Sequence, residues 1–245
     1  MAKPKIVPPD DERRMTVIEH LEELRRVLII SLIAWAVATA IGLAISQPVL
    51  GILLGPVHKV IGNQRLVYPG PIDAFLLFFK IGIFTGFVLS SPIIFWQAWT
   101  FIAPGLHRNE RRFAIGFVAS AVVLFAMGIA FAFFAMPIAL RFLTGIGSSE
   151  LQYLPFADKY INFILILIAI FGITFELPLA MTMLGLAGIV NTAFLRRRRF
   201  IFWIAIFVGA NMVTPGVDPF TPLLLTVPLI VLFEASILVI AALRR

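Results

Sequence analysis

The sequence predicts an all-α integral membrane protein with six transmembrane helices, and three observations support this fold class. Of 245 residues, 60% are hydrophobic and only 13% are charged, with a mean hydropathy of +1.01. Soluble domains contain roughly 45–50% apolar residues. Long apolar runs alternate with short polar segments, and every second polar segment is rich in lysine and arginine. We expect one transmembrane domain over 16–245, preceded by a flexible tail over 1–15.

Each apolar run has its own boundary signals. Thr16 and Glu19 form a capping-box pair that starts an amphipathic helix leading into the first run. The fifth run covers about 14 residues, or about 21 Å, against a hydrocarbon core of roughly 30 Å. The last two runs therefore form either two crossings or one shallow hairpin, and the length of the final run favours two crossings. The expected spans are 27–47, 73–98, 113–137, 158–186, 200–213 and 220–243.

The segments outside these spans alternate in character. The segment 48–72 is an expected external loop rich in proline and glycine, with a short membrane-surface helix over 52–60. A second external loop is expected over 139–156. Within the long fourth span, Pro178 is expected to bend the helix, because proline lacks the amide proton that a helix interior needs.

The distribution of positive charge predicts the orientation. Fifteen lysines and arginines lie in the N-terminal segment, the two arginine-rich bridges and the C-terminus, whereas four lie in the intervening loops. Cytoplasmic segments carry the excess of such residues, so both termini are expected in the cytoplasm of a multi-pass protein of the cytoplasmic membrane. The first span is not a removable signal peptide, because the segment before it is too long and too acidic.

Three charged residues lie well inside the expected spans, beyond their first two residues. Glu176 and Glu234 lie among apolar neighbours in the fourth and sixth spans. An ionised carboxylate there costs several kcal/mol unless it is paired, hydrated or protonated, so each is a functional candidate. For Glu176 a hydrogen bond between helices, made by the neutral acid, remains an equal alternative. Lys80 is expected to extend its ammonium toward the external interface.

The composition excludes several function classes. Cysteine is absent, so no disulfide or thiolate metal site is expected, and the three histidines lie outside the spans. No H-E-x-x-H or G-x-S-x-G motif occurs, so we expect neither an enzyme nor a cofactor. The arginines flank the spans rather than line one basic face, which argues against nucleic-acid binding.

Two functions remain on chemistry alone. One is an ion- or proton-coupled secondary transporter that uses Glu176 and Glu234. The other is a receptor for a cationic peptide, with Glu23 and Glu110 at the cytoplasmic rim. The residues by themselves do not separate these two functions.

Five sequence motifs together resemble the TatC family of the twin-arginine protein translocase. The similarity covers about 16–241, nearly the whole chain. The motifs are H-L-E-E-L-R at 20–25, W-T-F-I-A-P-G-L at 99–106, E-R-R at 110–112, F-G-I-T-F-E-L-P at 171–178, and Thr214-Pro215 with Asp218.

The resemblance implies a cup-shaped bundle that binds the twin-arginine signal peptides of folded proteins. It also implies work with the single-span subunits TatA and TatB, self-association, and transport driven by the proton-motive force. Glu176 is then the polar group within the concave face, and Pro56 supports the first external loop. The residues that the resemblance assigns to signal-peptide binding are Glu23, Arg25, Phe101, Pro104, Leu106 and Glu110.

One segment departs from the family pattern. Thr214 and Asp218 fall at the edge where the resemblance places the contact with a partner helix. Members of the family often have glutamine shortly after this turn, and Pro222 takes that place here. The polar contact with TatA or TatB at this edge is therefore expected to differ, with the Thr214 hydroxyl as the remaining polar group.

Overall fold

The structure, a computed structural model, consists of helices and short connecting segments in the part of the chain that it describes, with one isolated bridge between Val67 and Phe156. The described residues are 17–62, 64–102, 114–145, 154–186, 188–213 and 220–243. The helices are α1 (Val17–Ala44), α2 (Ser46–Ile61), α3 (Pro71–Ile102), α4 (Ala114–Gly145), α5 (Ala157–Phe175), α6 (Leu177–Leu186), α7 (Thr192–Arg197), α8 (Arg199–Val213) and α9 (Phe220–Leu243).

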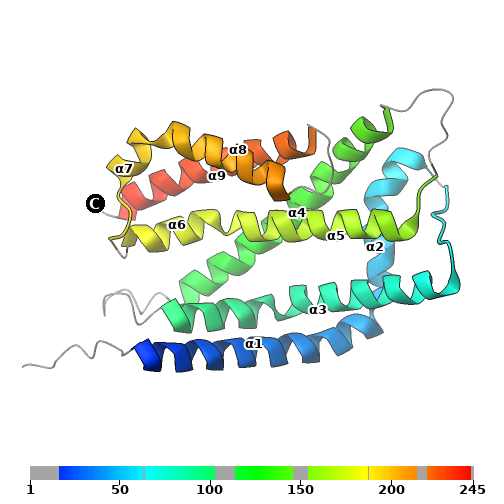
Figure 1. Cartoon of the computed structure of the whole chain (residues 1–245), viewed down its shortest axis with the longest axis horizontal. Helices are drawn as coiled ribbons and strands as arrows, with labels where there is room; N and C mark the ends of the chain where they lie inside the picture. Colours follow the sequence, from blue (N-terminus) through cyan, green and yellow to red (C-terminus); the bar gives the residue numbers. More distant parts are fainter. Residues whose placement is uncertain are drawn as a thin grey trace, which may run out of the picture.

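The long helices share one general direction (Figure 1). Helices α1 and α3 lie side by side along one edge, and α5 and α6 follow one another in a line roughly parallel to α3. Helix α4 crosses this layer obliquely and packs on α5, whereas α8 and α9 form the opposite edge. The start of α1 and the end of α9 lie at the same end of the molecule, which is the arrangement expected for an even number of crossings.

Five stretches of the described chain are long and apolar enough to cross a membrane: α1, α3, α4, the α5–α6 pair and α9. Helix α8 is also apolar, but it has only 15 residues and is therefore about 22 Å long. The prediction of an all-α membrane protein is confirmed at this level.

Several helix boundaries differ from the expected spans. The first helix ends at Ala44, and the segment from Ser46 to Ile61 is the single helix α2, so most of the loop expected over 48–72 is helical. Helix α3 begins at Pro71 rather than Asp73, because proline at the first helical position sacrifices no hydrogen bond. The prediction of a loop over 139–156 is wrong for its first seven residues, because α4 continues through Pro137 to Gly145.

The core centres on the α5–α6 pair, which has a larger share of buried residues than the other candidate membrane-spanning stretches. Ile164 and Phe171 of α5 pack in one cluster with Val57 of α2, Ile81 of α3 and Met136 of α4. All five side chains are at most 1% exposed. Helix α2 is thus part of the same core as the long apolar helices.

Two glycines allow helix backbones to approach closely. A Cβ atom on Gly86 of α3 would lie 2.5 Å from the Cα of Thr39 in α1, and one on Gly128 of α4 would overlap the carbonyl oxygen of Phe171 in α5. In lipid, helices gain association energy chiefly from such close packing. Nearby, the Trp35 indole N–H of α1 donates to the carbonyl oxygen of Ile83 in α3 at 3.0 Å.

The expected bend in the fourth span is confirmed as a break. Helix α5 ends at Phe175 and α6 begins at Leu177, with Glu176 between them in a turn. Pro178 cannot donate a backbone hydrogen bond to Thr174, four residues earlier. The Glu176 N–H instead donates to the carbonyl oxygens of Ile173 and Thr174 at the end of α5.

We predict that Gly86→Ala lowers the stability of the protein in detergent by about 1–3 kcal/mol, because the new methyl group overlaps the α1 backbone. Gly116→Ala is the matched control, since a Cβ atom on that helical glycine meets nothing within 4 Å. Thermal unfolding followed by circular dichroism measures both. Equal melting temperatures for the two variants would contradict the close approach of α1 and α3.

Candidate functional site

Two of the predicted site residues meet at one end of the bundle through a histidine. Glu23 lies in the second turn of α1, and its Oε2 atom is 3.8 Å from Nδ1 of His20, one turn earlier. The His20 ring stacks on Phe101, near the end of α3, with ring centroids 4.3 Å apart and planes 17° apart. Helices α1 and α3 thus bring Glu23 and Phe101 to the same place.

The Glu23 carboxylate is partly enclosed. Its side chain is 25% exposed, yet Oε2 has almost no exposed surface and no hydrogen bond in the described part of the chain. Buried polar atoms are usually hydrogen-bonded, so an acceptor of this kind indicates a place for an external donor. We call Glu23, His20 and Phe101 the rim cluster.

Arg25 does not belong to the rim cluster. It is exposed and lines a shallow surface depression with Glu22, Arg26, Ile29 and Ile30 on α1. Residues two positions apart on a helix point in different directions, so Arg25 and Glu23 do not face each other.

Five further predicted residues lie outside the described part of the chain: Pro104, Leu106, Glu110, Thr214 and Asp218. The first three belong to the bridge between α3 and α4. The end of α3 and the start of α4 lie at the same end of the bundle as the start of α1 (Figure 1).

Glu176 occupies the break between α5 and α6. It is half-buried, and its carboxyl is hydrogen-bonded to the backbone of Phe125 in α4. Its Oε1 atom is buried and has no hydrogen-bond partner among the described residues. The carboxyl thus combines a bond to a neighbouring helix, as expected of a structural acid, with one buried oxygen that is free to accept a further hydrogen bond.

Glu234 has a cationic neighbour. Its Oε2 atom lies 4.0 Å from Nη2 of Arg199, the first residue of α8, and both side chains are partly exposed, at 32% and 47%. A pair of this geometry and exposure contributes little to stability. It places Glu234 beside the arginine-rich segment rather than in the middle of the apolar bundle.

Lys80 makes a contact that the sequence did not indicate. Its ammonium donates a hydrogen bond of 3.1 Å to the side-chain oxygen of Asn162 in α5. The lysine side chain is exposed, as expected for one that extends toward an interface, but it reaches a neighbouring helix. Neither Asn162 nor His20 was predicted as a site residue. A helical periodicity marks the face on which a residue lies and not its partner on another helix.

Pro56 lies at the opposite end from the rim cluster. It is buried within α2, next to Val57, which is fully buried. The Tyr160 hydroxyl of α5 donates to the carbonyl oxygen of Leu53 in α2 at 2.6 Å. The backbone of Val67 also pairs with the segment before α5, because Ala157 N–H donates to its carbonyl oxygen at 2.8 Å. Helix α2 is therefore fixed to the start of α5.

A family model described as "Sec-independent protein translocase protein (TatC)" matches residues 19–228. The chain belongs to the TatC family. A TatC protein of Carboxydothermus hydrogenoformans is 39% identical over 94% of this chain and 94% of its own length. One of Aquifex aeolicus is 36% identical over 91% of this chain and 93% of its own length. Both carry the name Sec-independent protein translocase protein TatC.

A solved structure agrees with this assignment. The crystal structure of a twin-arginine translocase receptor TatC has a TM-score of 0.80 and 36% sequence identity, and the match covers 93% of this chain and all of that one. Membership of the TatC family decides between the two functions that the residues left open. The chain is a component of a protein translocase and not an enzyme, and the solute-transporter alternative loses its support.

We predict that Glu176→Leu abolishes most protein export by this TatC family member without lowering its melting temperature. Leucine removes the buried Oε1 atom, which has no partner among the described residues, and with it a desolvation cost of about 1–3 kcal/mol, which offsets the lost hydrogen bond to the backbone of Phe125. Export of a twin-arginine precursor in cells and thermal unfolding of the purified variant are the two measurements. Full export, or a clear loss of stability, would assign Glu176 to packing instead.

Proposed function

We propose that this chain is the core receptor subunit of the twin-arginine translocase, where it binds the signal peptides of folded precursors and nucleates the translocation complex. The observation that carries the proposal is the rim cluster. It holds a carboxylate oxygen of Glu23 that is enclosed and without a hydrogen-bond donor in the described part of the chain. The stacking of His20 on Phe101 holds the imidazole ring beside this carboxylate.

The chemistry of the two partners is complementary. A guanidinium group presents paired N–H donors that match the two oxygens of a carboxylate, and lysine cannot reproduce this fork. Two acids at the rim, Glu23 and Glu110, would together select an arginine pair over a lysine pair. Pro104 and Leu106 belong to the same bridge as Glu110 and would shape its surface, and Arg25 would lie beside it.

Charge pairs at an exposed rim are weak, each worth roughly 0.2–1 kcal/mol. Affinity therefore needs a second contribution, and the apolar stretch of the signal peptide supplies it by packing along the bundle. Glu176 lies further along this path, at the α5–α6 break. Its carboxyl would meet the polar backbone or the flanking residues of the inserted peptide.

We further propose that six helices cross the cytoplasmic membrane and form a cup, with both termini in the cytoplasm. The support is the alternation of arginine-rich segments with apolar helices. Helix α8 is the shortest crossing, and its length of about 22 Å requires the bilayer to thin around it. The exposed apolar residues of α8 would then face lipid or a partner helix.

The expected partners are TatA and TatB, further copies of this chain, and the signal peptides themselves. Helix α8 carries exposed Ile201, Ile204 and Val208, a stripe that suits a single-span helix. Thr214 and Asp218 follow α8 directly and would contact the partner at its external end. The proton-motive force would drive transport.

We predict that Glu23→Gln and Glu110→Ala each weaken crosslinking of a twin-arginine precursor about twofold to fivefold, since each removes one charge pair at an exposed rim. Glu22→Gln is the control, because this acid is exposed and lies outside the rim cluster. Site-specific photocrosslinking in isolated membranes measures binding, and immunoblotting confirms insertion.

A precursor with two lysines in place of the arginines completes the test. It should bind weakly to the unchanged chain, and Glu23→Gln should weaken its binding far less than that of the arginine precursor. If the arginine precursor binds equally well after both Glu23 and Glu110 are neutralised, the proposed recognition is wrong.

A further inference from the structure

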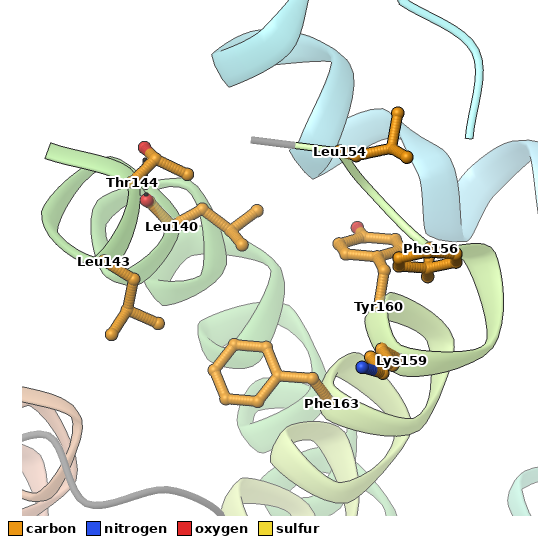
Figure 2. A pocket seen from close by; sticks show the side chains of 8 residues that line it. All are labelled: Leu140, Leu143, Thr144, Leu154, Phe156, Lys159, Tyr160 and Phe163. Atoms are coloured by element: carbon orange, nitrogen blue, oxygen red, sulfur yellow. Dashed lines mark hydrogen bonds between the residues drawn. The ribbon is translucent and has the colours of Figure 1, made fainter. Parts of the chain in front are cut away.

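A cavity of about 430 Å³ lies at the opposite end of the bundle from the rim cluster. Figure 2 shows the lining side chains around it, with those of α4 on one side and those of α5 and the segment before it on the other. The cavity opens beside the ends of two membrane-spanning helices. Its lining residues are Leu140, Leu143, Thr144, Leu154, Phe156, Lys159, Tyr160 and Phe163.

The polar groups in its wall are already engaged, with one exception. The Thr144 hydroxyl donates to the carbonyl oxygen of Leu140 at 2.8 Å, and the Tyr160 hydroxyl donates to Leu53 at 2.6 Å. The exception is the ammonium of Lys159, which is 5.4 Å from the centre of the Phe156 ring and forms no salt bridge within the described residues. The cavity therefore offers an apolar wall and one cation.

The charged and the apolar lining residues lie at different depths along the helices. Lys159 lies two residues after the start of α5, and Phe163 lies about 6 Å deeper along the helix. Thr144 lies one residue before the end of α4, and Leu140 lies about 6 Å deeper. The cation is thus at the level of lipid headgroups, and the apolar side chains are at the level of acyl chains.

The volume selects the type of occupant. One turn of an α-helix with a diameter of 10 Å and a pitch of 5.4 Å occupies roughly 400 Å³. A membrane-spanning helix of a partner needs several times this space, so the cavity accepts about one turn at most. A flexible acyl chain with an anionic headgroup fits both the volume and the distribution of charge.

We propose that this cavity binds one anionic phospholipid of the external leaflet, with its phosphate on Lys159 and an acyl chain against Leu140, Leu143 and Phe163. The bound lipid would fill the space between α4 and α5 at the point where α2 is fixed to α5. The proposal rests on the membrane placement of the chain and does not depend on the recognition of arginine pairs at the rim cluster.

Native mass spectrometry of the detergent-purified chain tests the proposal. With phosphatidylglycerol and phosphatidylcholine of identical acyl chains, we expect one phosphatidylglycerol to be retained preferentially. Lys159→Gln should lower this retention about fivefold, the effect of one lysine near an anionic lipid surface. Lys59→Gln is the matched control, because this lysine is also exposed but lies in α2 and does not line the cavity.

A second variant tests the contribution of the cavity's space without changing the charge of Lys159. Leu143→Trp fills the space, so retention of phosphatidylglycerol should be lost while the melting temperature stays within a few degrees of the original. Equal retention of both lipids by the unchanged chain would overturn the proposal, as would equal losses in Lys59→Gln and Lys159→Gln. A photocrosslinker at Thr144 that captures a protein helix instead of lipid in membranes would also overturn it.

Discussion

The hydrocarbon of a bilayer offers no hydrogen-bonding partner, and the rest of this structure depends on that constraint. Backbone groups in such a medium must be satisfied inside the element that carries them, which leaves the helix as the usual solution. Lipid tails are as apolar as the helix surfaces, so two helices gain little free energy from hydrophobic burial against one another. They associate where their backbones can approach, as α1 and α3 do at Gly86.

The same constraint makes each polar exception informative. The α5–α6 break removes one backbone hydrogen bond at Pro178 and places the Glu176 carboxyl beside it. The Lys80 ammonium of α3 donates a hydrogen bond to Asn162 of α5. Polar groups that find partners within the bundle hold helices together, whereas one buried carboxyl oxygen each of Glu23, Asp158, Glu176 and Glu234 makes no hydrogen bond among the described residues. Each of these oxygens can accept a further hydrogen bond.

The two ends of the bundle serve different purposes. At the end with the chain termini, the rim cluster presents an acid and a ring stack at the meeting point of α1 and α3. At the other end, α2 inserts Val57 into the common core and accepts a hydrogen bond from Tyr160. The contacts of α2 thus tie the helices together at the end opposite the chain termini.

The sequence by itself determined the membrane class, the number of apolar runs, the bend at Pro178 and the identity of the acids, because these follow from composition, run length and local backbone chemistry. It did not determine that α4 extends to Gly145 or that the segment after Ala44 is one helix, because proline and glycine are tolerated in helices whose surroundings are apolar. Only the tertiary structure stacked His20 of α1 on Phe101 of α3 and paired Glu234 of α9 with Arg199 of α8. Those contacts join residues of different helices, and helix packing, rather than local periodicity, decides which side chains meet.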